Sequence, residues 1–186
     1  MPSVYCGSVD YYAKMSAYGK VAIDTNRRFN KREKDSHRCS IEGPNGVQRL
    51  TVPLEKPTEW HSTRLKDVRI STHGEWWNVH WGAICAAYGR TPFFEYYEDD
   101  LKHAFNGEIE MLVQLNDYID RFCRNALGIV SNNENTVAAV DIVNTKDVEY
   151  YQIWARKYGF TPHLSALDLI FNMGNEAPLV LKEMTS

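Results

Sequence analysis

The sequence predicts an α+β or α/β fold, a single domain over residues 1–186 with a small N-terminal sheet and several packed helices. Three observations support this prediction. Two β-rich runs flank a Gly-Pro-Asn-Gly turn within about residues 38–54, which is typical of a hairpin. From residue 74 onwards the apolar spacing changes to three or four residues, as in helices. The β-type segments come first and the helical ones follow, an order that favours these two classes.

The N-terminal part alternates between short elements and polar loops. Residues 9–20 predict a short helix with Gly19 at its C-terminal cap. Residues 21–25 form a compact apolar run that ends in Asp24, which indicates a buried strand. The polar and mainly basic stretch 26–38 is interpreted as an exposed loop or strand edge.

The hairpin is the clearest local pattern in the chain. Its Asn-Gly pair favours the positive φ angles of a tight turn. Alternating spacing then places four apolar side chains on one buried face: Ile41, Leu50, Val52 and Leu54. After a second polar loop, the apolar residues Leu65, Val68 and Ile70 predict another short strand.

Residues 74–89 predict a helix that is buried on most sides, because two adjacent stripes along it are apolar. These stripes contain Trp76, Trp77, His80, Trp81, Ala83, Ile84, Ala87 and Tyr88. We expect the helix to end near Gly89, with Pro92 preventing simple continuation.

The remaining chain predicts two further helices and a strand. Residues 108–128 form an amphipathic pattern that ends at Gly128, with Cys123 beside its apolar face as a core thiol. Residues 136–143 indicate a buried strand. The segment 159–174 is interpreted as a loop followed by a helix that begins after Ser165 or after the preceding Pro-His-Leu segment.

The composition excludes several classes of protein. With 44% hydrophobic residues, the chain has ample apolar surface for a core, so global disorder is not expected. The formal charge of -3 argues against nucleic-acid binding. We expect no signal peptide and no membrane span, because no apolar run is long enough. The four cysteines are scattered, so we expect reduced thiols in a cytoplasmic protein.

Common catalytic motifs are absent from the sequence. It contains no GxGxxG or GxxxxGK[ST] phosphate cradle, and no GxSxG nucleophile turn. Without HExxH or a CxxC pair, we predict no metal site, and the cofactor stays unknown.

His80 is the foremost candidate for a catalytic residue. Burial among tryptophans favours the neutral imidazole, the form that acts as a general base. The alternative is a core histidine hydrogen-bonded to a backbone carbonyl. Likewise, the carboxylates Glu95, Glu98, Asp99 and Asp100 either include one with a raised pKa, bind a cation, or form an exposed helix face.

The basic loop offers a second chemistry. It contains Arg27, Arg28, Lys31, Arg32, Lys34 and Arg38. Arginine suits phosphate because its planar fork makes two parallel hydrogen bonds, so this loop either receives an anionic substrate or is a bare surface. Cys39, next to Arg38, is either a nucleophile or a packing residue of the strand, and Cys6 raises the same question with less context.

Several segments together resemble the WbqC-like protein family. They are YCGSVDYYAKMSAYGKVAID, HRCSIEGPNGVQRLTVPL, KDVRIS, WWNVHWGAICAAYGRTPFFEYYEDDL and YYQIWARKYGFTPHLSALDLIFNMGNEA, in the expected order. The resemblance implies a link to bacterial surface-polysaccharide (O-antigen) gene clusters, and this version is similar to the Bacteroides-type branch. It implies no defined reaction.

The family's polar positions map onto a definite set of residues here. That set is Tyr12, Asp24, Arg38, Asn45, Asp67, His80, Glu95, Asp99, His163, Asp168 and Asn172. His37 and His163 stand where many relatives have asparagine, and Cys6-Gly7-Ser8 departs from a proline-containing pattern. The resemblance therefore does not support a catalytic role for Cys6, His37 or His163.

Two functions remain open from the sequence. The first is a transferase that moves an acyl or aminoacyl group to a sugar or nucleotide-linked sugar. In it, His80 is the base, Asp24 or Asp99 orients that base, and Arg38 binds the anionic substrate. Tyr12, Asn45, Asp67 and Glu95 are expected to contribute to substrate binding. The second is a non-catalytic carbohydrate-binding or assembly partner of other polysaccharide enzymes, with aromatic rings stacked on sugars.

Overall fold

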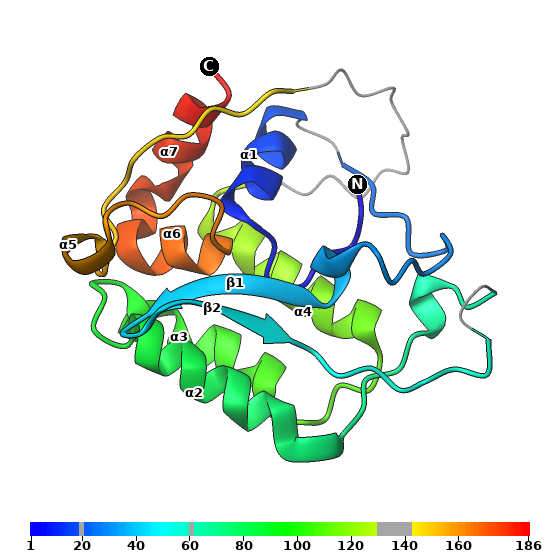
Figure 1. The fold of residues 1–186 in the computed structure, drawn as a ribbon. Helices are drawn as coiled ribbons and strands as arrows, with labels where there is room; N and C mark the ends of the chain where they lie inside the picture. Colours follow the sequence, from blue (N-terminus) through cyan, green and yellow to red (C-terminus); the bar gives the residue numbers. More distant parts are fainter. Residues whose placement is uncertain (19–20, 60–61, 130–142) are drawn as a thin grey trace.

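A computed structural model describes residues 1–18, 21–59, 62–129 and 143–186. Within them, a two-stranded hairpin crosses the molecule, with α2 and α3 below it, α1, α6 and α7 above it, and α4 passing behind it in Figure 1. The strands are β1 (Arg38–Gly43) and β2 (Gly46–Thr51). The α-helices are α1 (Val9–Tyr18), α2 (Trp76–Tyr88), α3 (Phe94–Lys102), α4 (Leu112–Ala126), α5 (Ala155–Tyr158), α6 (Ala166–Met173) and α7 (Ala177–Met184). This arrangement confirms the predicted fold class, an α+β chain with a small N-terminal sheet and packed helices.

The hairpin is confirmed at the predicted place. β1 and β2 pair antiparallel from Arg38 opposite Thr51 to Gly43 opposite Gly46. The positive φ of 90° falls on Gly46, and Asn45 is not among the residues with positive φ. Pro44 and Asn45 therefore form the tip, and glycine takes the left-handed position.

One face of the hairpin is buried against α2. Ile41, Leu50 and Val52 are buried as predicted, while Leu54 is half-buried and bridges to Ile70. Alternation along the strands thus predicted the burial, because a strand turns successive side chains to opposite faces.

Four predicted helices are present with small shifts at their ends: α1, α2, α4 and α6. The side chain of Ser165 accepts a hydrogen bond from the Leu167 N–H at the start of α6, which is the expected N-cap arrangement. For α2 the predicted burial was too broad. Asn78, Val79 and Gly82 are exposed, so one face of this helix meets solvent.

Two predicted strands are wrong. Residues 21–25 have no regular structure and are half-buried or exposed, and none of the described residues pairs with their backbone in a sheet. In the segment 65–71, Leu65–Asp67 form a 3-10 turn, and only single bridges join Arg69 and Ile70 to their neighbours. Most of the strand predicted at 136–143 lies outside the described residues, with Val143 alone inside them.

The segment 148–165 runs over α6 and is tied to it by polar contacts. The Tyr150 hydroxyl donates to Asp168 Oδ2 at 2.8 Å, and Gln152 Nε2 donates to the same oxygen at 2.9 Å. The Thr161 hydroxyl donates to buried Glu42 on β1 at 2.9 Å. These bonds fix the backbone that leads to His163.

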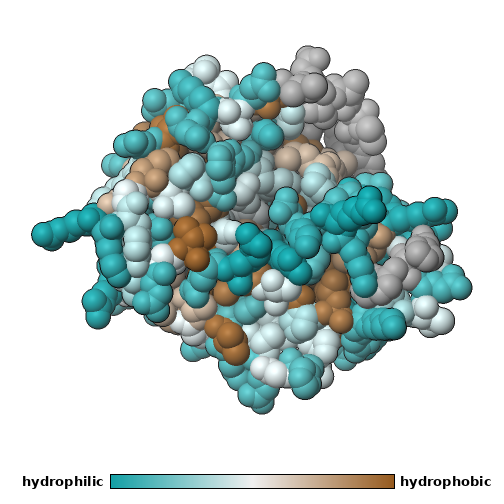
Figure 2. Space-filling view, viewed as in Figure 1, coloured by the Kyte–Doolittle hydropathy of each residue, from teal (hydrophilic) through white to brown (hydrophobic). Residues whose placement is uncertain are grey.

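The surface is mostly hydrophilic on the face seen in Figure 2, with separate small apolar patches. Cys6, Cys39, Cys85 and Cys123 are all free thiols, in agreement with the sequence. In the part of the chain that the structure describes, no helix combines the length and the apolar character that a membrane crossing requires.

Candidate functional site

A cavity of about 530 Å³ opens where the N-terminal loop, β1, β2 and the starts of α1 and α6 come together. We call it the Arg38 cavity. Its walls include Tyr5 to Ser8 from the N-terminal loop, Arg38 to Ser40 from β1 and His163 from the loop before α6. The volume is within the range of small-molecule sites.

Main-chain pairing brings these segments together. The N–H of Val9 donates to Leu164 O at 2.9 Å, and the N–H of Ala166 donates to Gly7 O at 2.8 Å. The N–H of Ser165 donates to Ser40 O at 2.8 Å, which joins the same corner to β1. Consequently α1 and α6 begin side by side at the cavity, and their N-terminal ends carry partial positive charge.

The cavity has a cationic side. Arg38, Arg49 and Lys34 line it, opposed by Asp10 and Asp35. The Nε atom of Arg38 is buried and has no hydrogen-bond partner among the residues that the structure describes. A buried guanidinium donor without a partner is costly, and a guanidinium that lines a cavity is a suitable group to bind an anion there.

The turn before α1 adds backbone donors. Cys6 adopts a left-handed φ of 43°, and Gly7 is packed so closely that a Cβ there would lie 2.8 Å from Val4 Cγ2. Among the described residues, no hydrogen bond uses the N–H of Gly7 or Ser8. Successive free N–H groups at such a turn form a concave site for anions.

His163 lies at the cavity rim and is held by carboxylates. Its Nδ1 lies 3.0 Å from Asp10 Oδ2, and its Nε2 lies 3.8 Å from Asp147 Oδ1. The side chain is 63% exposed, and its hydrogen bond to Asp10 raises the pKa of the imidazole. These three residues offer ligand atoms within 4.8 Å of one another, so they could also hold a cation.

The cavity thiols are poorly suited to nucleophilic attack. Cys6 and Cys39 both line the wall and are buried. Burial raises the pKa of Cys6 well above its usual value, and a hydrogen bond with Cys39 adds to the effect. Cys6 therefore stays a neutral thiol, which is a weak nucleophile.

His80 lies behind the cavity wall. Its Nδ1 is 2.7 Å from the hydroxyl of Tyr5, a residue of the wall, and its ring packs edge-on against Trp76 at 5.0 Å between centroids. Burial lowers the pKa of His80 to about 4, although a hydrogen bond to the Thr51 backbone acts in the opposite direction and raises it. With 4% of its surface exposed, His80 matches the core-histidine alternative.

The other predicted site residues are dispersed. Tyr12 is fully buried and donates to Asp120 Oδ1 at 3.1 Å. Asp24 is exposed and accepts from the Asn26 N–H, while Asn45 is exposed at the hairpin tip. Asp67 is exposed in its 3-10 turn.

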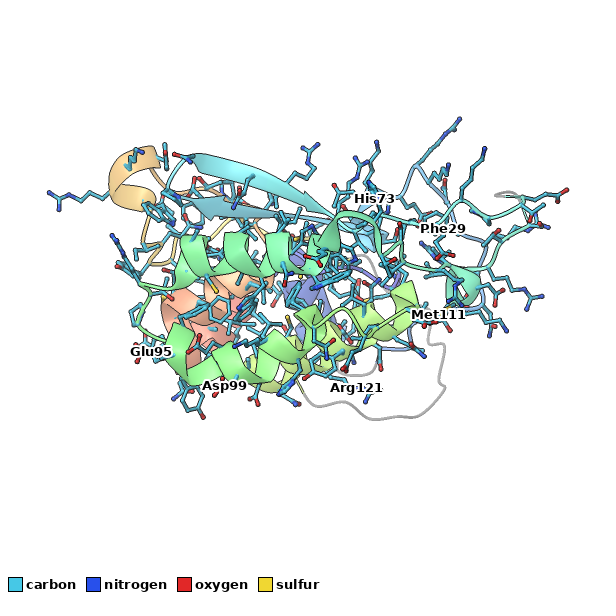
Figure 3. All side chains as sticks on the ribbon, turned by 90° about the horizontal axis from the view of Figure 1, so that it is seen from below. Phe29, His73, Glu95, Asp99, Met111 and Arg121 are labelled. Atoms are coloured by element: carbon cyan, nitrogen blue, oxygen red, sulfur yellow. The ribbon has the colours of Figure 1, made fainter. Side chains whose placement is uncertain are left out.

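Glu95 and Asp99 point outward from α3, as Figure 3 shows. The remaining positions mapped through the family are His163, at the cavity rim, and two residues of α6. Asp168 and Asn172 are buried in α6, where burial raises the pKa of Asp168 to about 6. Thus Arg38 and His163 line the cavity, and Asp24, Asn45 and His80 do not join them there.

Sequence reasoning missed Asp10, Arg49 and the backbone donors before α1. The signal for Asp10 was weak, because an acidic residue in a first helical turn is common. The pairing of Ser8 with Ser165 across the corner has no local pattern, since it joins residues far apart in the chain.

Comparison with known proteins gives one match. The family model described as "WbqC-like protein family" matches residues 3–143. No curated protein and no solved structure matches.

Proposed function

As this chain belongs to the WbqC-like protein family, we propose that it is an enzyme of bacterial surface-polysaccharide biosynthesis that acts in the cytoplasm. The proposed reaction is transfer of an acyl or aminoacyl group to a sugar or nucleotide-linked sugar. The Arg38 cavity is the proposed substrate site, and one single domain over 1–186 carries it. We expect no nucleic acid as a partner. Other enzymes of polysaccharide biosynthesis are candidate protein partners.

One observation carries the proposal: Arg38 lines a cavity that also presents unused backbone N–H groups, and its buried Nε has no hydrogen-bond partner among the described residues. Arg49 and Lys34 add positive charge at the same place. This combination suits the phosphate groups of a nucleotide-linked sugar, because charge-assisted hydrogen bonds to phosphate are stronger than neutral ones.

In the proposed reaction, a sugar amine or hydroxyl attacks the acyl carbonyl carbon. The new bond forms as the bond to the donor's leaving group breaks, and the attacking atom loses a proton to a base. His163, positioned by Asp10 at 3.0 Å, is the proposed base. The proton then passes to the leaving group.

This assignment changes the roles expected from the sequence, and it gives His163 a catalytic role that the family resemblance alone did not support. His80 is behind Tyr5, and Asp24 and Asp99 are exposed elsewhere, so the proposal gives them no part in proton transfer. Tyr12, Asn45, Asp67 and Glu95 also lie outside the cavity walls and receive no substrate contact.

Calorimetric titration tests the binding step. Uridine diphosphate and pyrophosphate should bind the wild type, and Arg38→Gln should weaken both by about tenfold to a hundredfold, the usual worth of a hydrogen bond to a charged group. Arg90→Gln is the matched control, because Arg90 is exposed and outside the cavity. Equal binding by wild type and Arg38→Gln would remove the cavity from the proposal.

Mass spectrometry tests the reaction. Nucleotide-linked sugars are incubated with a panel of acyl thioesters and aminoacyl donors, and the sugar product is checked for the added group. His163→Asn should bind uridine diphosphate normally but lose turnover by on the order of a hundredfold. Binding without any product would favour the non-catalytic carbohydrate-binding or assembly role instead.

A further inference from the structure

A second cavity, of about 770 Å³, lies between α3 and α4. We call it the tyrosine cleft, and define it by Tyr96, Asp100, Tyr118, Arg121, Asn125 and Asn175. Tyr96 and Asp100 are four apart on α3, and Tyr118, Arg121 and Asn125 are three or four apart on α4. Each set therefore shares one helical face, and the two faces meet at the cleft.

The tyrosines of this cleft are unusually open. Tyr96 is 77% exposed and Tyr118 is 37% exposed. The Tyr96 ring is anchored edge-on against Tyr97, with 4.7 Å between centroids, and the Tyr118 hydroxyl donates to the Asp100 carbonyl at 2.9 Å. The two rings are thus held in place while presenting apolar surface to solvent.

A sugar ring fits both the aromatic and the polar parts of the cleft. One face of a pyranose carries C–H groups that pack on the electron-rich face of an aromatic ring. Its hydroxyls both donate and accept, which matches the carboxamides of Asn125 and Asn175 and the carboxylate of Asp100. A small polar hollow of this size suits such a ligand better than a broad protein partner.

The charge of the cleft selects among sugars. Arg121 is paired with Asp117, whereas Asp100 makes none of the ion pairs found among the described residues. Glu95 and Asp99 on the same helix add further negative charge, and Figure 3 shows them with Arg121 along one edge of the molecule. We propose that the tyrosine cleft binds a neutral or amine-bearing saccharide and rejects acidic sugars and nucleotides.

This site is separate from the proposed substrate site. The tyrosine cleft shares no lining residue with the Arg38 cavity. With Arg121 paired to Asp117, the remaining lining charge of the cleft is the carboxylate of Asp100, whereas Lys34, Arg38 and Arg49 line the Arg38 cavity. Failure of one proposal therefore leaves the other standing, because each rests on its own residues and its own probe.

The test is titration of the full chain with four probes, followed by ¹H–¹⁵N NMR. The probes are glucose, galactosamine, a neutral glucose oligosaccharide and glucuronate. Glucose, the oligosaccharide and galactosamine should shift resonances of α3 and α4, and glucuronate should not. Tyr96→Ala should weaken this binding by about tenfold, since it removes an exposed stacking ring. Asp100→Asn should weaken galactosamine more than glucose.

Tyr151→Ala is the matched control, because Tyr151 is also exposed but lies outside the cleft. It should bind like the wild type, and melting curves should show all three variants folded. The proposal is overturned if no probe binds, if glucuronate binds as well as glucose, or if Tyr96→Ala binds unchanged. Self-association that Tyr96→Ala abolishes, without sugar binding, would instead identify the cleft as a contact between copies of this chain.

Discussion

His80 and His163 show how burial gives one residue type two different chemistries. His80 is enclosed by aromatic rings, so desolvation lowers its pKa to about 4 and it stays neutral. His163 is open to solvent beside Asp10, so its pKa is raised. From the sequence, His80 attracted attention because of its tryptophan neighbours. Those neighbours belong to the core around it, and Tyr5 stands between His80 and the Arg38 cavity.

His80→Gln should destabilise the fold at neutral pH. The imidazole Nδ1 is bonded to Tyr5 and the ring is also bonded to the Thr51 backbone, so a side chain that cannot reach both leaves a buried polar group unpaired. We expect a loss of about 1–3 kcal/mol, visible as a fall in melting temperature of several degrees.

The stability difference between the wild type and His80→Gln should depend on pH, which gives a sharper check. Between pH 6.5 and about 4 the unfolded state takes up the His80 proton and the folded state does not, so the wild type loses this stability as the pH falls. The gap between wild type and His80→Gln should therefore narrow from pH 7 to pH 4 in thermal melts. Identical melting at both pH values, together with lost turnover, would return His80 to the catalytic role.

At the scale of elements, periodic patterns were predictable and long-range pairing was not. The spacing of apolar residues located α1, α2, α4 and α6, because a helix satisfies its own backbone. The run 21–25 has the same apolar character as a strand, yet it has no partner strand in the described part of the chain. Isolated runs of this kind depend on neighbours that the local sequence does not reveal.

Alanine substitutions at two glycines should change stability in opposite directions, one through close packing and the other through helix propensity. Gly7→Ala should lower the free energy of unfolding by about 1–3 kcal/mol, because its Cβ would lie 2.8 Å from Val4 and 3.0 Å from Tyr11 in the corner that joins α1 to α6. Gly82→Ala, in the exposed middle of α2, meets nothing within 4 Å and should stabilise by about 0.5–1 kcal/mol.

Urea denaturation of both variants provides the measurement, and each serves as the control for the other. Uridine diphosphate binding should also weaken in Gly7→Ala and stay unchanged in Gly82→Ala, since Gly7 lines the Arg38 cavity. A Gly7→Ala protein as stable as the wild type would show that this corner can relax, and the backbone donors of Gly7 and Ser8 would lose their fixed geometry.

For the whole molecule, the composition predicted a hydrophobic core but not the positions of the two cavities. The apolar share of 44% and the helical stripes indicated which residues are inside. The two cavities arise where segments distant in sequence meet, such as residues 8 and 165 at the first cavity and the α3 and α4 faces at the second. Of the predicted site residues, Arg38 lines the first cavity, and the sequence drew attention to it because a basic loop leads directly into the hairpin.

The cysteines provide a test of whether these segments form one cooperative unit. Cys6, Cys39 and Cys123 are buried in the N-terminal loop, β1 and α4, whereas Cys85 on α2 is half-buried. A thiol reagent should therefore modify Cys85 first in the native protein. The other three are buried and should react later, and a common rate for Cys6, Cys39 and Cys123 would show that the cavity wall and α4 open together.

Mass spectrometry of peptides after timed alkylation measures these rates, and alkylation in denaturant without reductant should label all four thiols. Raising the pH speeds each reaction through the thiolate fraction, so the comparison is made at one fixed pH. If Cys6 and Cys39 react as fast as Cys85 while Cys123 stays protected, the corner around the Arg38 cavity opens independently of α4. Its anion-binding donors would then be assembled only part of the time.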